Sequence, residues 1–283
     1  IVTNIIINLN FDLMKTILVP TDFSETAEKA LGVAAEIGNL QQSQLVLMHT
    51  SLPTEGVNSN VYAAIYIHEY LETKRKNLNL LADKVREGGY KGEIKTDNKV
   101  DFTAPSIVGA AEEFNADLVV MGSTGASGLT GVFLGSIAGG VLSKIERPLF
   151  LITRDFTLPE RGDLLIGTDY KTKPDKHSLE ILRFFKEKLN FKLNLIHISH
   201  GEDVTIDKDT FIDSNFEGII DAHVDVPGPK VEGALKKIKE KYQNAVLCTI
   251  TRKRSWFESL FSHSVSRSLT HYSDIPLLCL QSQ

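Results

Sequence analysis

The chain has 283 residues, of which 42% are hydrophobic and 24% charged, and its formal net charge is −5. This composition is typical of a globular protein, and the length favours two domains. The acidic balance gives no support for nucleic acid as a general partner, and no apolar run approaches the roughly 20 residues of a membrane-spanning helix.

The chain begins with a segment, residues 1–13, that stands apart from the rest of the sequence, because Met14 and Lys15 are typical of a natural start. This segment has an apolar stretch but no basic region and no small-residue cleavage site, so a signal peptide is disfavoured. Three interpretations stay open: an upstream extension, an expression artefact, or a strand added to an exposed sheet edge.

Strands and helices are expected to alternate from Lys15 onward. We expect strands at 15–20, 44–50, 91–98, 116–122 and 148–153, and helices at 24–38, 63–88, 103–114 and 135–145. Such alternation predicts a parallel sheet with helices on both faces and right-handed crossovers.

The second part of the chain repeats the first. Leu18 to Asp22 (LVPTD) recurs as Leu165 to Asp169 (LIGTD), and LVLMH, ending at His49, recurs as LNLIH, ending at His197. We expect strands at 163–168, 191–199, 218–226, 244–250 and 275–281, and helices at 174–189, 229–242 and 261–271. Only residues 207–216 stand in place of the long second helix. The prediction is α/β, with two tandem five-stranded, doubly wound parallel sheets related by a pseudo-twofold axis.

A glycine motif follows the apolar run that ends at Met121. It consists of Gly122 to Gly125 (GSTG), nine further residues, and Gly135-Ser136 at an expected helix start. Glycines let the backbone approach a ligand closely, and a helix start offers N–H groups to an anion. The pattern is neither a Walker loop nor G-x-G-x-x-G. It predicts a phosphate cradle, with a mobile glycine-rich surface loop as the alternative.

These segments together resemble the universal stress protein family. The resemblance rests on ILVPTDFS (17–24), LMHT (47–50), VMGSTG (120–125), Gly135-Ser136 and RPLFLI (147–152). It covers residues 14 to about 153 and includes the family's nucleotide motif, G-x2-G-x9-G-(S/T), with unchanged spacing. The resemblance implies an adenine nucleotide alpha-hydrolase-like, Rossmann-like fold and a role in stress response or regulation. It also implies ATP as ligand, with Mg²⁺ carried on the nucleotide.

The resemblance assigns twelve residues to the nucleotide. They are Pro20, Thr21, Asp22, Thr50, Met121, Gly122, Ser123, Thr124, Gly125, Gly135, Ser136 and Ile137. Two roles are open for Asp22, contact with the adenine or ribose end and capping of the first helix, and its place at the carboxyl edge of the sheet favours the first. For Asp169, which lacks a glycine loop, capping is favoured. His49 and His197 are interpreted as packed structural residues.

The second copy loses the glycines. Ile250, Lys253 and His263 replace them. A Cβ at each position blocks close backbone approach, so the second copy is not expected to bind ATP in the same way. The basic run 252–254 is interpreted as a solvated turn rather than an anion site, and the aromatic cluster 256–261 as packing rather than a partner surface.

No catalytic residue and no metal-ligand set is predicted. Ser136 has no nucleophile elbow and no His/Asp pairing around it. Cys248 and Cys279 lie in apolar runs, which favours buried inert thiols. Low cysteine usage, with only these two in the sequence, fits a cytoplasmic location. The favoured domains are residues 14–154, which bind ATP, and 155–283, which form a degenerate partner. A slow ATP hydrolase or phosphotransfer enzyme and a nucleotide-free interaction scaffold are the alternatives.

The final strands of the two copies are both short and apolar. Pro148 to Ile152 closes the first copy and Pro276 to Leu280 closes the second. Because an unpaired apolar edge strand promotes aggregation, we expect these two strands to pair antiparallel within the chain. A homodimer and a protein client stay open, and neither nucleic acid nor membrane is an expected partner.

Overall fold

The computed structural model describes residues 13–51, 61–101, 103–125, 134–199, 207–227, 240–242, 244–251 and 275–282. Several expectations lie outside these ranges: the segment 1–12, the basic run 252–254, the aromatic cluster 256–261, the helix at 261–271 and most of the helix at 229–242.

The first half alternates strands and helices as expected. Its elements are β1 (Thr16–Pro20), α1 (Glu25–Gln41), β2 (Gln44–Ser51), α2 (Val61–Glu87), β3 (Ile94–Val100), α3 (Thr103–Glu113), β4 (Leu118–Gly122), α4 (Ser136–Leu142) and β5 (Leu149–Ile152). Helix α1 begins after Ser24, whose side chain accepts a hydrogen bond from Ala27 N (3.2 Å), and ends at the left-handed Gln42. These caps set the two ends of the helix, which begins shortly after β1 ends.

In the described residues the second half follows the same plan, and its first two helices are shorter than those of the first half. Its elements are β6 (Gly162–Gly167), α5 (Lys176–Glu187), β7 (Phe191–Ser199), α6 (Lys208–Phe216), β8 (Ala222–Pro227), β9 (Ala245–Thr251) and β10 (Leu277–Gln281). Helix α6 had no sequence-based assignment. It forms because Asp207 caps it, accepting a hydrogen bond from Thr210 N (3.1 Å), and it ends at the left-handed Glu217.

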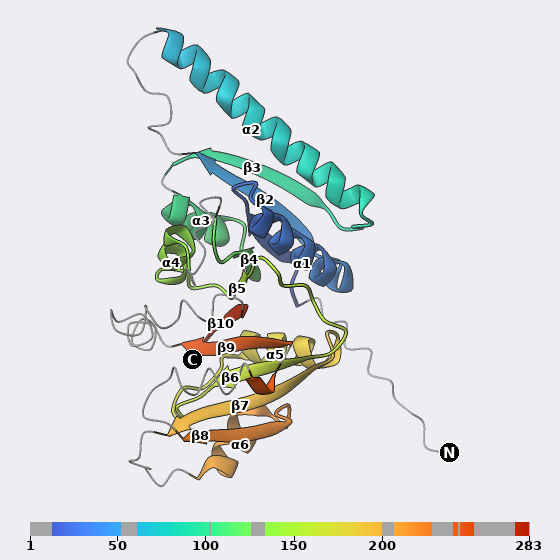
Figure 1. The fold of residues 1–283 in the computed structure, drawn as a ribbon, viewed down its shortest axis with the longest axis vertical. Coiled ribbons are helices and arrows are strands. Elements are labelled where there is room, and N and C mark those ends of the chain that lie inside the picture. Colours follow the sequence, from blue (N-terminus) through green and yellow to red (C-terminus); the bar gives the residue numbers. More distant parts are fainter. Residues whose placement is uncertain are drawn as a thin grey trace.

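The ten strands of the described residues form one sheet in the order β3-β2-β1-β4-β5-β10-β9-β6-β7-β8. Read outward from the β5–β10 junction, the two halves have the same order, and Figure 1 shows them on either side of that junction. The α/β prediction is confirmed, and the two expected five-stranded sheets are continuous with one another. A domain boundary at residue 154 stays a prediction.

The junction is the one antiparallel pairing among the named strands. Leu277 pairs with Leu151, Leu278 with Phe150, and Cys279 with Leu149. The expected antiparallel pairing of the two final strands is therefore confirmed. Since each strand covers the apolar edge of the other, the join removes two exposed edges from the molecule.

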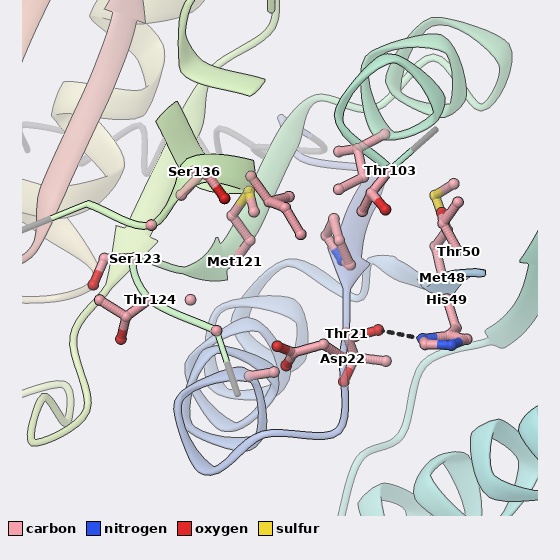
Figure 2. Close-up of a pocket in the computed structure, with 18 of the residues that line it drawn as sticks. Thr21, Asp22, Met48, His49, Thr50, Thr103, Met121, Ser123, Thr124 and Ser136 are labelled. Carbon is pink, nitrogen blue, oxygen red and sulfur yellow. Dashed lines mark hydrogen bonds between the residues drawn. The ribbon is translucent and has the colours of Figure 1, made fainter. Parts of the chain in front are cut away.

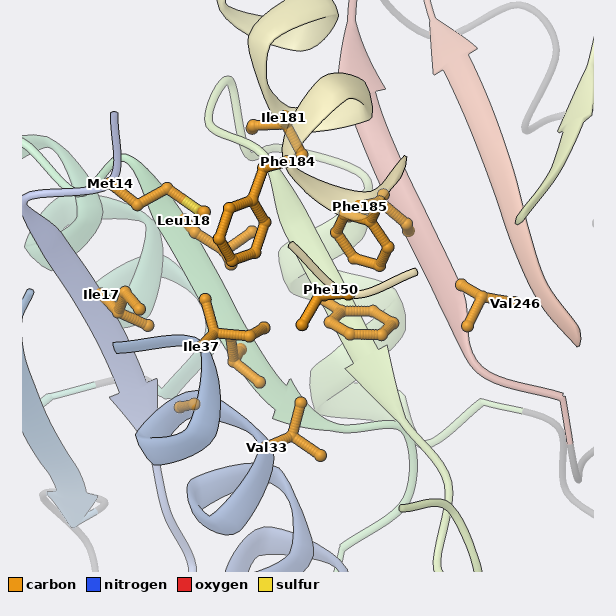
Figure 3. Packing of buried hydrophobic residues seen from close by; sticks show 14 of the residues in the cluster. Met14, Ile17, Val33, Ile37, Leu118, Phe150, Ile181, Phe184, Phe185 and Val246 are labelled. Carbon is orange, nitrogen blue, oxygen red and sulfur yellow. The ribbon is translucent and has the colours of Figure 1, made fainter. Parts of the chain in front are cut away.

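The hydrophobic core on one face of the sheet is shared by the two halves. Phe150 of β5 is fully buried, and its ring lies 5.7 Å from that of Phe185 on α5, edge to face. Val33 and Ile37 of α1 belong to the same cluster (Figure 3). Cys248 lies in this cluster and Cys279 in the cluster on the opposite face. Both are buried free thiols, as expected from their apolar surroundings.

Candidate functional site

A cavity of about 370 Å³ opens at the carboxyl ends of β1, β2 and β4. Parallel α/β sheets bind ligands at this edge. All twelve residues assigned from the sequence line it (Figure 2): Pro20, Thr21, Asp22, Thr50, Met121, Gly122, Ser123, Thr124, Gly125, Gly135, Ser136 and Ile137. The fold thus brings together two segments that lie about a hundred residues apart in the sequence.

The end of β1 turns sharply into the cavity. Thr21 N donates a hydrogen bond to Met48 O (2.8 Å), and Thr21 Oγ1 accepts one from Phe23 N (3.0 Å). Phe23 has a φ of 63°, in the left-handed region that non-glycine residues rarely adopt. Tyr170, at the equivalent corner of the second half, has a φ of 53°, so this conformation belongs to the repeated corner of the fold.

Asp22 is not the cap of α1, because Ser24 holds that position. Its Oδ1 instead accepts a hydrogen bond from Ser24 N (3.0 Å), which fixes the carboxylate at the cavity wall. The carboxylate faces the glycine loop, since a Cβ built on Gly125 would lie 2.7 Å from Asp22 Oδ2. The capping alternative for Asp22 is therefore wrong.

Asp169, the repeat counterpart of Asp22, is also not a helix cap, so that expectation is wrong too. Asp175 caps α5, and Asp169 Oδ1 accepts hydrogen bonds from Lys171 N and Thr172 N (both 2.8 Å). Burial raises the pKa of Asp169, but the hydrogen bonds from Thr172 and Lys171 outweigh it, and the pKa is lowered overall.

The two parts of the glycine motif are tied together. Gly135 N donates to Ser123 O (2.7 Å), and Ser123 N donates to Ile152 O (2.8 Å) in the neighbouring strand β5. A Cβ on Gly122 would lie 3.0 Å from Thr26 Cγ2, whereas one on Gly135 meets nothing closer than 3.5 Å. Packing alone thus restricts Gly122, whereas a Cβ at Gly135 would make only ordinary van der Waals contacts with the loop.

Gly135 also forms the start of α4. It has extended backbone angles, and no side chain caps the helix. Ser136 and Ile137, the first two residues of α4, line the cavity, and the Ile137 side chain is 40% exposed there. An apolar side chain thus borders the open part of the site.

Eight further residues line the cavity without a ligand role predicted from the sequence. They are Ala27, Met48, His49, Tyr70, Lys74, Thr103, Ile107 and Ala138. Tyr70 and Lys74 come from α2, where they precede the fully buried Leu78 at intervals of four residues. This spacing puts all three on one face of the helix. The same spacing in the sequence could have indicated that Tyr70 and Lys74 face the interior side of the helix.

His49 combines packing with a place in the cavity wall. Its Nδ1 lies 2.8 Å from the Thr21 carbonyl oxygen, as the dashed line in Figure 2 marks, and its ring centroid lies 4.7 Å from that of Phe23. A carbonyl only accepts hydrogen bonds, so the contact places a proton on Nδ1. The packed, hydrogen-bonded role expected for His49 is confirmed.

In the described ranges, no group of three or more His, Cys, Asp or Glu side chains is arranged to hold a metal ion. A search of the same ranges finds no helix with the length and apolarity needed to cross a membrane.

These features define an α/β protein with a cavity between the first strand and a glycine loop. A sequence model of the universal stress protein family matches residues 14–153. The chain is 31% identical over 150 residues to a universal stress protein of Synechocystis sp., covering 48% of this chain and 96% of the relative. It is 27% identical over 158 residues to one of Methanocaldococcus jannaschii, covering 50% and 96%. The protein belongs to the universal stress protein family.

The fold of both halves has a counterpart among solved structures. A universal stress protein from Archaeoglobus fulgidus superposes with a TM-score of 0.71 and 24% sequence identity. The superposition covers 95% of this chain and 97% of that one. The arrangement beyond residue 153, where the family model ends, is therefore also found in a solved structure.

Proposed function

We propose that the cavity binds an adenine nucleotide, with ATP as the first candidate, and that the chain is a nucleotide-binding module of a stress response or regulatory process. One observation carries this proposal. Twelve residues assigned from the motif and the family resemblance surround a single cavity of about 370 Å³. That volume lies within the usual range of small-molecule sites, about 300–1,000 Å³.

The residues present fit such a ligand. The glycine loop supplies backbone N–H groups and close approach, which suit phosphate oxygens. Ser136 adds a hydroxyl donor at the same place. Asp22, fixed by the Ser24 amide, accepts hydrogen bonds from the ribose hydroxyls or the adenine amine. The hydroxyl oxygen of Thr50 is buried and has no hydrogen-bond partner among the described residues, so a ligand group would satisfy it.

Mg²⁺ would arrive on the nucleotide and keep several of its waters. It would neutralise phosphate charge, and the protein residues would hold and orient the nucleotide. A cytosolic location stays a prediction, and the two buried free thiols fit it.

A single experiment separates this function from its alternatives. The full chain is purified without added nucleotide, and the ligand released on denaturation is identified by mass spectrometry. A binding module should release an adenine nucleotide, and the protein should not turn it over when Mg²⁺ is added. Sustained turnover would instead assign a slow hydrolase or phosphotransfer enzyme. No released nucleotide, together with no binding of added ATP, would leave the interaction scaffold.

A further inference from the structure

The corner around His49 is repeated around His197. His49 Nδ1 lies 2.8 Å from Thr21 O, and His197 Nδ1 lies 3.0 Å from Thr168 O. Each histidine ring also packs on an aromatic ring from the adjoining corner, at centroid distances of 4.7 Å and 4.9 Å. The two corners can therefore be compared residue by residue.

Each corner carries a lysine above its aromatic ring. Lys74 Nζ on α2 lies 5.3 Å from the centroid of Phe23, and Lys208 Nζ on α6 lies 5.6 Å from that of Tyr170. The short helix α6 thus places a lysine where the long helix α2 places one. Lys74 and Lys208 are structural counterparts.

The two lysines differ in their counter-ions. Lys208 Nζ lies 2.6 Å from Asp225 Oδ2. The strand register sets Asp225 opposite His197 and Asn98 opposite His49, so a neutral amide stands where the second half has a carboxylate. No carboxylate of the described residues lies within ion-pair distance of Lys74.

Lys74 lines the cavity, whereas Lys208 forms an ion pair with Asp225 of the same chain. Among the described residues that line the cavity, Lys74 is the only lysine or arginine. The loop residues 126–133 carry no charged side chain in the sequence. Helix α2 packs on β2 and β3, while the glycine loop follows β4, and β1 lies between β2 and β4. Lys74 therefore comes from a helix on the opposite side of β1 from the glycine loop.

We propose that Lys74 binds a second phosphate group of the nucleotide, at the end of the ligand away from the glycine loop. This inference rests on the proposed nucleotide function. In the second half, the equivalent Lys208 pairs with a carboxylate oxygen of Asp225. In the first half, a phosphate oxygen of the ligand takes the place of that carboxylate oxygen. Ammonium groups bind phosphate oxygens through short, charge-assisted hydrogen bonds. The ligand class is a nucleotide with phosphates at two separate places, either a dinucleotide or a mononucleotide with a further ribose phosphate.

The test compares singly and doubly phosphorylated probes on the full chain. AMP, adenosine 3′,5′-bisphosphate and the 5′-phosphorylated dinucleotide pApA are titrated calorimetrically into the wild-type protein and into Lys74→Met. Methionine keeps an apolar stem over the rings and removes the charge. At least one doubly phosphorylated probe should bind the wild type about tenfold tighter than AMP, which corresponds to about 1.4 kcal/mol. In Lys74→Met this ratio should fall toward one, while AMP affinity stays within about threefold.

Two further variants sharpen the result. Lys208→Met is the matched control and should keep the wild-type ratio. Asn98→Asp supplies the carboxylate of the second half and should lower the ratio as Lys74→Met does, with thermal unfolding used to confirm that it is folded.

Identical ratios in the wild type and Lys74→Met, or an equal loss for AMP and the doubly phosphorylated probes, would overturn the inference. If AMP and the doubly phosphorylated probes all bind the wild type with the same affinity, the inference fails and the proposed function stands. If neither these probes nor ATP bind, the proposed function fails as well.

Discussion

The carboxylate of Asp22 lies directly against Gly125, so that a Cβ on this glycine would come within 2.7 Å of Asp22 Oδ2. The aspartate follows β1 and the glycine follows β4, so this contact joins the ends of two neighbouring strands in the cavity wall. It also means that Gly125 has a packing role before any ligand binds. Gly135, which has no such crowding, is the better position for testing the phosphate cradle.

Gly135→Val should keep the fold and lose the ligand. The nearest atoms to a Cβ at this position are 3.5 Å away, and the backbone φ of −66° suits valine. The side chain would lie against Ser123, Thr124 and Gly125 of the loop, so we expect ATP affinity to fall at least about tenfold. Calorimetric titration gives the affinity, and thermal unfolding checks the fold. Wild-type affinity in the folded variant would show that the loop does not hold the phosphates.

Asp22→Ala and Asp169→Ala form a matched pair, because the two aspartates occupy equivalent corners. Asp22→Ala should weaken ATP binding about tenfold or more by removing a charge-assisted hydrogen bond to the ligand. Asp169→Ala should leave ATP affinity unchanged and lower the free energy of unfolding by about 0.5–1.5 kcal/mol, since it removes exposed hydrogen bonds from the amides of Lys171 and Thr172. Equal losses of affinity in the two variants would contradict the assignment of the ligand to the first half.

The lowered pKa of Asp169 gives a pH dependence of stability. A carboxyl with a lower pKa in the folded state stabilises the protein above its unfolded pKa, about 3.9. That contribution is lost as the pH falls through the folded-state pKa. The difference in unfolding free energy between the wild type and Asp169→Asn should be constant above about pH 5 and shrink below about pH 4. Denaturant titrations at several pH values measure it, and a difference that grows on acidification would refute the assignment.

Residues 14–154 expressed alone should dimerise or aggregate. In the full chain, Leu149, Phe150 and Leu151 pair with β10, and all three are buried. Without the second half, this apolar edge and the core face of Phe150 would be exposed to water. Light scattering over a range of concentrations measures the association. A fragment that stays monomeric and folded at high concentration would show that the second half is not needed to cover the edge.

The strand positions could be predicted because they depend on local pattern, chiefly short apolar runs. The place of the twelve residues in one cavity could be predicted from the family resemblance, which strand exits and glycine spacing carry. The role of Asp22 could not be decided in this way, since Asp22 and Ser24 are both good helix caps. Ser24 is the cap because Phe23 has a left-handed φ, which is not helical, so the helix begins only after Ser24. Lys74 and Tyr70 were missed because their place in the cavity depends on how α2 packs on β2 and β3. Helix α6 was missed because its residues carry almost no amphipathic pattern, so its caps define it.

The central claim is that the chain has one ATP site, in its first half. Calorimetric titration of the full chain with ATP and Mg²⁺, in parallel with Asp22→Ala and Asp169→Ala, tests it most directly. We expect a stoichiometry near one that Asp169→Ala preserves, and greatly weakened binding in Asp22→Ala. Two sites of comparable affinity, or a single site that Asp169→Ala abolishes and Asp22→Ala does not, would contradict it.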